Sequence, residues 1–350
     1  MLTIGIDLGD KWSHVCVLDE SGEVIERGRV LTQPASLQQR FGGLPGALVA
    51  IEAGTHSAWA EKVLSAAGHT VLVANSRRVR LISQSSSKFD EIDAERLARL
   101  ARVEPRLLAP IRHRQGAVRE HLAILKARDG LVRIRTGLIN QVRGVVKAFG
   151  MRLKECGTTV FHVRAPEQIP EELKPALLPL LDTIRDLSQR IHDYELVIKR
   201  VAREHYPETV LLQQVAGVGP LTSMCFVMVI DDPARFSSSR SLGAYLGLRP
   251  RRRQSGECDP NMRISKAGDT LLRRLLVGSA HYILGPFGPD CDLRRWGLSM
   301  AAKGDKRARK RSLVAVARKL AVLLHRLWVT GEMYEPFRNS AGRAKPVHAA

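Results

Sequence analysis

Four carboxylates in the first hundred residues have the types and positions that a metal site needs. Asp7 stands in the apolar stretch "LTIGIDLG", where a strand would ordinarily carry Val or Ile, so its charge needs a partner or a cation. Glu52 ends another apolar stretch, and Asp90 and Asp93 are spaced to share one helix face. Converging carboxylates repel one another unless a divalent cation binds between them. The sequence therefore predicts a Mg²⁺ site at Asp7, Glu52, Asp90 and Asp93 that acts on a phosphodiester; the alternative is that Asp90 caps the helix and Asp93 faces solvent.

A candidate nucleophile lies in "RRRQSGECDPNMRISKAGD", residues 251–269, where Ser255 and Gly256 follow three arginines. A serine hydroxyl must be activated before it can attack a phosphodiester, and we expect that activation to come from the metal at the Asp7 cluster. Cys258 is a weaker candidate for a reactive group. The cations expected to hold phosphates near the serine are Arg249, Arg251, Arg252, Arg253, Arg263 and Lys266.

A glycine-containing turn in "QVAGVGPLTSMCFVMVI", residues 214–230, has the pattern of a helix-hairpin-helix segment. Gly217 and Gly219 would allow backbone N–H groups to approach a phosphate at the start of a helix. The alternative is a plain turn between two helices.

The elements that must position the carboxylates alternate in the first hundred residues. Three strands joined as a meander come first, and helices and strands then alternate, which is the order of the ribonuclease H-like fold. In that fold the first and fourth strands lie side by side, so Asp7 and Glu52 would converge. We expect strands at 2–9, 14–20, 23–30, 47–54 and 70–75, and helices at 36–41, 57–67 and 90–103.

Longer helices follow from about residue 115, where apolar residues recur every three or four positions. The pattern, whose spacing is briefly irregular near Gly130, predicts an antiparallel helical hairpin. Its arginines are expected on an exposed face, either merely solvated or along a nucleic-acid backbone: Arg128, Arg133, Arg135 and Arg143. Two more helices are expected at about 268–284 and 305–328. The predicted domains are 1–110, a hairpin at 111–207, a mainly helical domain at 208–337 and a flexible tail at 338–350.

Composition narrows the class of protein. The 350 residues contain 55 Lys and Arg against 35 Asp and Glu, a formal charge of +20, which is the footprint of a polyanion binder. The five cysteines are scattered and none forms a C-x-x-C pair, which argues against a disulfide framework or a structural zinc. There is no leader-like segment and no apolar run near the roughly 18 residues of a membrane span, so we expect a cytoplasmic protein without a membrane partner.

The motif "GIDLG" also opens actin-like and Hsp70-like ATPases, where the turn handles nucleotide phosphate and Mg²⁺. Those folds need a second such turn and a glycine-rich adenosine pocket. This chain continues into amphipathic helices instead, which disfavours an ATPase.

Taken together in this order, "GIDLGDKWSHVCVLDE", "AIEAG", "KFDEIDAERLARLA", "VAGVGPLTSMCFVMVIDDPARFSSSRSLGAYLGLRP" and "SGECDPNMRISKAGDTLLRRLLVGSA" resemble the Piv-like transposases of the bacterial insertion-sequence family IS110. The resemblance implies an α/β RuvC-like domain with a DEDD set, a coiled-coil linker and a mainly α transposase domain. It places the DEDD set on Asp7, Glu52, Asp90 and Asp93, and the nucleophile on Ser255. It also implies Mg²⁺, donor and target DNA, a structured bridge RNA, a dimer of dimers with composite sites, and association with the nucleoid.

The chain departs from the family pattern in two places around the serine. The family commonly doubles the serine before the glycine, whereas this chain has Gln254-Ser255, and "ECDPNM" replaces a Gly-Lys-rich stretch. Ser265, in "ISK", is the alternative nucleophile. Two other functions stay open: a metal-dependent, structure-specific endonuclease of the Holliday-junction-resolvase type, in which water attacks, and a non-catalytic nucleic-acid scaffold.

Overall fold

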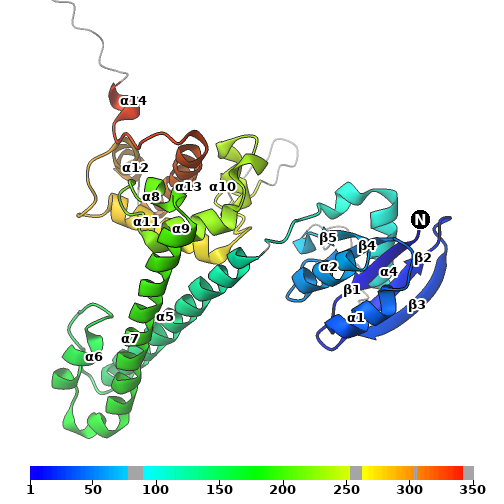
Figure 1. The fold of residues 1–350 in the computed structure, drawn as a ribbon. Coiled ribbons are helices and arrows are strands. Elements are labelled where there is room, and N and C mark those ends of the chain that lie inside the picture. Colours follow the sequence, from blue (N-terminus) through cyan, green and yellow to red (C-terminus); the bar gives the residue numbers. More distant parts are fainter. Residues whose placement is uncertain (78–89, 115, 253–261, 303, 305, 342–350) are drawn as a thin grey trace, which may run out of the picture. The chain divides into compact units, whose positions relative to one another are not determined.

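The structure is a computed structural model that describes residues 1–77, 90–114, 116–252, 262–302, 304 and 306–341 (Figure 1). The chain divides into two compact units, Met1–Arg114 and Gln115–Ala350. The finer division at residues 110, 207 and 337 stays a prediction.

A mixed five-stranded sheet forms the centre of the first unit, in the order β3-β2-β1-β4-β5. The first three strands run antiparallel, whereas β1 pairs with β4, and β4 with β5, in parallel. The predicted strands and the adjacency of the first and fourth are confirmed. The strands are β1 Thr3–Asp7, β2 Trp12–Leu18, β3 Val24–Leu31, β4 Leu48–Glu52 and β5 Thr70–Ala74.

Helices cover both faces of this sheet (Figure 1). On one face, α1 (Pro34–Phe41) and α2 (Ser57–Ala66) bury the large side chains of the strands, such as Ile6 and Ile51. On the other face, α4 (Asp90–Val103) packs on small residues, and η1 (Pro105–Leu108) follows it. Successive residues of a strand point to opposite faces, so each strand supplies both layers.

Two long helices of the second unit, α5 (Ala117–Ala148) and α7 (Lys174–His205), lie side by side, with α6 (Phe161–Arg164) near one end (Figure 1). Arg128 pairs with Glu195 and Arg135 bonds Ser188, so numbers rise along one helix as they fall along the other. The helices therefore run antiparallel. Coiled-coil packing between them stays a prediction. The short turns η2 Pro166–Gln168 and η3 Glu171–Leu173 complete the connection.

The apolar spacing is irregular near Gly130, yet α5 continues through that residue, as a helix was expected to. One expectation for this helical pair is wrong. Arg135 is not on an exposed face: it is 6% exposed, and its guanidinium donates to Ser188 Oγ at 3.2 Å and Thr158 Oγ1 at 3.4 Å. Its long apolar stem can pack between helices while the head finds hydroxyl partners.

The rest of the second unit is mostly helical, as expected, and packs around α9 (Pro220–Ile230). Every residue of α9 from Thr222 to Ile230 is buried, against helices that include α7 and α11. No helix within the described ranges is both long and apolar enough to cross a membrane. The other elements are α8 Glu208–Leu212, η4 Pro233–Arg235, η5 Ser239–Ser241, α10 Leu242–Tyr245, α11 Thr270–Leu284, α12 Asp292–Ala302, α13 Lys306–Thr330 and α14 Arg338–Ala341.

Candidate functional site

Asp7 and Glu52 occupy equivalent places at the ends of two neighbouring parallel strands. Ile6 of β1 pairs with Ile51 of β4, and each carboxylate is the next residue on its strand. Because side chains alternate along a strand, both carboxylates point away from the face that buries Ile6 and Ile51, and both are partly buried. The sheet thus brings these two predicted residues together on the face covered by α4.

Helix α4 approaches this face unusually closely because the strand below it carries a glycine. A Cβ on Gly5 would stand 1.9 Å from the backbone oxygen of Ala94 and 2.6 Å from the nitrogen of Ala98. Ala50 lies on the same face and packs against later residues of α4. Small residues in both strands therefore fix the depth at which the helix lies.

The direction of α4 across the sheet follows from contacts made by its C-terminal turn. Arg102 donates to the backbone oxygens of Asp19 and Glu20, which follow β2 beside the start of β1. Arg27 of β3 bonds Glu95 at 2.8 Å, and this hydrogen bond, with one from Arg99, lowers the pKa of Glu95. With its last turn at the start of β1, α4 has its first turn toward the end of β1, where Asp7 stands.

Asp93 and Asp90 occupy that first turn. The Asp93 carboxylate accepts a hydrogen bond from Arg96 at 3.2 Å and is about one-third exposed. Asp90 begins the helix, but its side chain lies outside the described residues. Within the described part of the chain, no three His, Cys, Asp or Glu side chains form a group that could hold a metal. The backbone nevertheless brings Asp7, Glu52 and the first turn of α4 to one edge, and carboxylate oxygens are the donors that Mg²⁺ prefers.

Histidines near this edge were missed by the sequence reasoning. His14 is the cross-strand partner of Asp7, so the two side chains share one face. His56, after β4, lies 3.8 Å from Asp10, in the turn after β1, measured from Nε2 to Oδ1. Side chains alternate along "WSHVCVL", so His14 and Cys16 point to the same face of the sheet. This alternation could have placed His14 beside Asp7. The His56 pair joins two loops and leaves no sequence signal.

In the second unit, two short stretches on either side of the segment with Ser255, residues 249–251 and 263–265, form an antiparallel pair that we call the stem. Pro250 pairs with Ile264, Arg251 N donates to Arg263 O at 3.0 Å, and Ser265 N donates to Arg249 O at 2.9 Å. Ser255 and Arg253 lie outside the described residues. Alternation places four side chains on one face of this stem, three of them exposed cations: Arg249, Arg251, Arg263 and Ser265.

Close backbone contacts hold the stem on the helical core. A Cβ on Gly247 would stand 2.1 Å from Ala267 N, and one on Gly268 would stand 2.1 Å from Tyr245 O. Both glycines and Lys266 have positive φ, the left-handed region that favours glycine. Arg273 donates to Ala267 O at 2.6 Å, which fastens the segment to α11. Lys266 and Arg252 are exposed, as a phosphate contact requires.

The turn at Gly217 and Gly219 leads into α9. Gly217 has a φ of +83° and packs against α11, where an added Cβ would meet Tyr282 Cδ1 at 3.0 Å. Gly219 is exposed, adopts an extended conformation and caps the start of α9. The two glycines line a concavity of about 510 Å³ with Thr222 and Arg274, so close packing explains Gly217 while Gly219 remains open to a ligand.

Comparisons with known proteins match both parts of the chain. Residues 4–151 match the model DEDD_Tnp_IS110, described as "Transposase", and residues 210–287 match "Transposase IS116/IS110/IS902 family". The "Transposase for insertion sequence element IS1111A" of Coxiella burnetii is 30% identical over 342 residues, 95% of this chain and 90% of that relative. The "Probable family 20 transposase" of Pseudomonas aeruginosa is 29% identical, over 95% and 98% of the two chains. The "Pilin gene-inverting protein" of Moraxella lacunata is 31% identical over 114 residues, 32% and 34% of the two chains.

Proposed function

Since the chain belongs to the IS116/IS110/IS902 family of transposases, we propose that it is a recombinase that cuts and rejoins DNA through a covalent phosphoserine at Ser255. Transposases bind, cut and transfer DNA, and the family matched by the N-terminal part implies a divalent metal. The observation that carries the proposal is the placement of Asp7 and Glu52 on one face, at adjacent strand ends.

The donor set at that edge fits a hard divalent cation such as Mg²⁺. Asp7 and Glu52, with Asp90 and Asp93 of α4, would hold the metal through carboxylate oxygens. A divalent metal there would neutralise charge on a scissile phosphate and lower the barrier to attack. The fold expected for this unit is ribonuclease H-like (RuvC-like), and the strand order β3-β2-β1-β4-β5 with α4 on the carboxylate face supports it.

The residues of the second unit would bind and orient the DNA. Arg249, Arg251 and Arg263, on one face of the stem, would hold phosphate oxygens beside the segment that carries Ser255. As the Ser255 oxygen bonds to phosphorus, the bond from phosphorus to the departing DNA oxygen breaks, and one DNA end leaves as a free hydroxyl. Attack by a hydroxyl end on the phosphoserine then rejoins DNA and releases Ser255. The bond energy is conserved, so no nucleotide cofactor is required.

We propose, on the resemblance to Piv-like IS110 transposases, that a structured bridge RNA selects donor and target DNA. Base pairing rather than side chains would then carry sequence choice, much as in RNA-guided nucleases. The same resemblance supports a dimer of dimers, with the carboxylates of one subunit serving the serine of another. Sequencing the nucleic acid that copurifies with the protein tests this: one structured RNA is expected, and a random mixture would contradict guidance.

Serine substitutions test the covalent step. Ser255→Ala should abolish protein–DNA adducts on denaturing gels in Mg²⁺ while leaving DNA binding within about twofold, since it removes only the attacking oxygen. Ser265→Ala is the matched control, because Ser265 lies on the stem, and should retain adducts. Normal adducts in Ser255→Ala, lost in Ser265→Ala, would assign the nucleophile to Ser265.

A carboxylate substitution separates recombination from hydrolysis. Asp7→Asn should remove cleavage, whereas Glu23→Gln, at an exposed carboxylate just before β3, should not. Free DNA ends that persist in Ser255→Ala and vanish in Asp7→Asn would instead identify a nuclease of the Holliday-junction-resolvase type, in which water attacks.

A further inference from the structure

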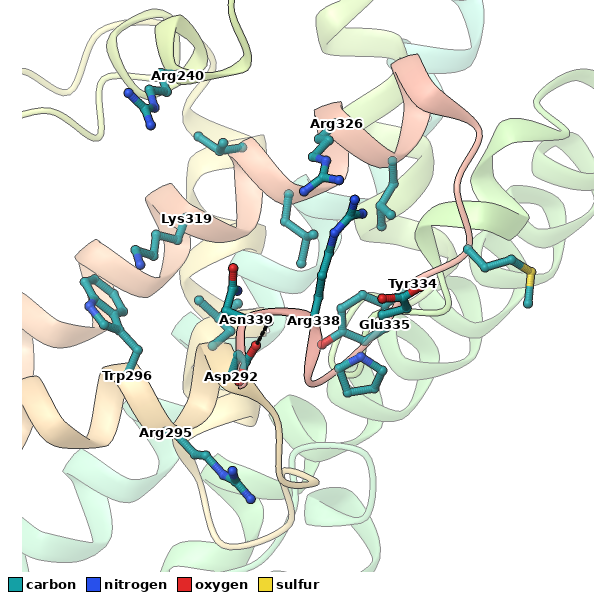
Figure 2. Close-up of a pocket in the computed structure, with 16 residues that line it drawn as sticks. Arg240, Asp292, Arg295, Trp296, Lys319, Arg326, Tyr334, Glu335, Arg338 and Asn339 are labelled. Carbon is teal, nitrogen blue, oxygen red and sulfur yellow. Dashed lines mark hydrogen bonds between the residues drawn. The ribbon is translucent and has the colours of Figure 1, made fainter. Parts of the chain in front are cut away.

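A cavity of about 780 Å³, lined by charged and apolar side chains, lies in the second unit between α12, α13 and the segment that follows α13 (Figure 2). We call it the Trp296 groove. Its lining includes five cationic side chains and two carboxylates: Arg240, Arg295, Lys319, Arg326 and Arg338 against Asp292 and Glu335. Two further acids pair with lining arginines, Asp290 with Arg295 and Glu332 with Arg326 and Arg338, so the cations outnumber the acids by one.

The segment after α13 is fixed as one wall of the groove. Pro336 O accepts from Asp292 N at 2.8 Å, and Asn339 N donates to Asp292 Oδ2 at 2.7 Å, the bond drawn in Figure 2. Tyr334 N donates to Gln214 Oε1 at 2.9 Å. Burial raises the pKa of the Tyr334 hydroxyl, so this side chain stays neutral at physiological pH. These hydrogen bonds hold the segment after α13 in place as a wall of the groove.

One end of the groove pairs an aromatic ring with a cation. Lys319 Nζ lies 3.9 Å from the centroid of the Trp296 ring, and Figure 2 shows the two side by side. Burial, and then the nearby Arg318, lower the pKa of Lys319 because both disfavour its charged form, which a bound anion would stabilise. In the part of the chain that the structure describes, neither Lys319 nor Arg240 forms an ion pair. An anion entering here would meet charge that no carboxylate offsets.

The other end holds two arginines that share one acid. Arg326 bonds Glu332 Oε2 at 2.9 Å, and Arg338 bonds the same oxygen. Their side chains are 41% and 44% exposed, and ion pairs this exposed contribute roughly 0–1 kcal/mol. One carboxylate cannot neutralise two guanidinium groups, so an incoming phosphate can take bonds from both at little cost.

The two ends are separated by a distance that matches a short strand. Lys319 and Arg326 are seven residues apart on α13, which places them on one helix face about 10 Å apart. Val322 and Leu323 line the groove between them. At the roughly 3.4 Å per nucleotide of a fully stacked strand, this length accommodates at most about three nucleotides, and fewer of an extended strand.

We propose that the Trp296 groove binds a short single-stranded stretch of nucleic acid, with phosphates on Arg326 and Arg338 and a base at Trp296 and Lys319. Cations that follow a backbone and an aromatic ring that stacks a base are the usual parts of a single-strand site. A surface that binds duplex by charge alone needs no aromatic wall. The proposal rests on the proposed function for its ligand, because a recombinase must handle strands that have left the duplex.

Fluorescence anisotropy with the full chain tests the groove. The probes are a labelled 12-nucleotide single-stranded DNA, the same sequence as RNA, and the DNA duplex, all in EDTA so that no cleavage occurs. The charge variant is Arg326→Gln with Arg338→Gln. Its matched control is Arg185→Gln with Arg190→Gln, which also removes two exposed cations, one of them paired with carboxylates.

The groove variant should weaken single-strand binding at least tenfold, and the control less than twofold. The slope of log affinity against log salt should fall by about 1.4, because each lost phosphate contact contributes about 0.7 on a single strand. Trp296→Leu should weaken binding about fivefold without changing that slope, since stacking carries no charge. A loss for DNA alone, RNA alone or both supports the groove and identifies the strand it takes.

Two results overturn the proposal: equal weakening in the groove and control variants, or a loss for duplex as large as for single strands. Circular dichroism at 222 nm must be unchanged in each variant, and the salt slope distinguishes lost contacts from lost folding. Because these measurements need no metal and no chemistry, they stand apart from the Ser255 adduct assay, so either proposal can fail alone.

Discussion

At the scale of single residues, Gly5 decides where the candidate carboxylates lie. Its missing side chain lets α4 rest on β1, and the same helix begins with Asp90 and Asp93. The residue that most constrains the site is therefore not one with chemistry of its own. A methyl group at this position would push the helix off the strand and move the acids with it.

Gly5→Ala should lower the free energy of unfolding of the first unit by about 1–3 kcal/mol, the usual cost of overpacking, because the new Cβ would meet backbone 1.9 Å away. Urea unfolding followed by circular dichroism measures it. Gly137→Ala is the matched control: it lies inside α5 with nothing within 4 Å of the added Cβ and should stabilise by about 0.5–1 kcal/mol. Equal shifts in both variants would show that α4 adjusts without cost.

At the scale of elements, the predicted strands were recognisable as short apolar stretches between turns, several of which contain glycine. Helix α12 was not predicted, since "DLRRWGLSMAA" carries charges and a central glycine. Tertiary contact explains that glycine: a Cβ on Gly297 would stand 2.5 Å from Val316. Arg135 was misplaced for a related reason, because an apolar period does not reveal a polar side chain buried on the packing face.

The candidate site was predictable only in part, again for reasons of element geometry. Asp7 and Glu52 lie at strand ends, and Asp90 and Asp93 lie at a helix start. The predicted order of strands and helices was enough to place these elements. The contact between His56 and Asp10 joins two loops, whose closure no local pattern encodes. The same holds for the Trp296 groove, which unites η5, α12, α13 and the segment that follows α13.

The junction of α5 and α7 carries a pH-sensitive contact. The His121 ring stacks on His205, with centroids 5.1 Å apart, and its Nδ1 lies 2.9 Å from the Tyr206 hydroxyl. Burial, and then the neighbouring His205, lower the pKa of His121 below its usual value near 6.5. The unfolded chain then binds the proton more tightly than the folded protein, so stability falls as pH drops from about 6.5 through the folded pKa.

Melting temperature should therefore fall between pH 7.5 and pH 5.5. His121→Gln should flatten this dependence because it removes the group whose protonation the folded state opposes. His192→Gln, on α7 and exposed, should leave it unchanged. A His121→Gln profile as steep as that of the parent would assign the acid sensitivity to other groups.

At the scale of the whole molecule, the buried apolar clusters follow the division into two units. Three clusters draw their residues from the first unit and two from the second. Each unit thus has an apolar core of its own, as an independently folding domain requires.

Calorimetry should accordingly resolve two unfolding transitions. Gly5→Ala should lower the melting temperature of one transition, that of the first unit. Arg135→Ala should lower the melting temperature of the other, because losing a buried hydrogen-bonded group destabilises the second unit by roughly 1–3 kcal/mol. Arg133→Ala, at a side chain 69% exposed, should change neither by more than about 0.5 kcal/mol. If both transitions shift in each variant, the two units unfold as one.

The burial of α9 on every side has a consequence for protein synthesis. Its segment "MCFVMVI" is apolar, rich in β-forming residues and uncharged, a composition that aggregates when exposed. Trp328 of α13, whose ring centroid lies 6.4 Å from that of Phe226 in α9, comes about a hundred residues later, a point that a ribosome translating 5–20 residues per second reaches after about 5–20 s. During that interval the nascent chain carries α9 without its final cover, so slower growth or a chaperone that holds apolar segments should raise the yield of native protein.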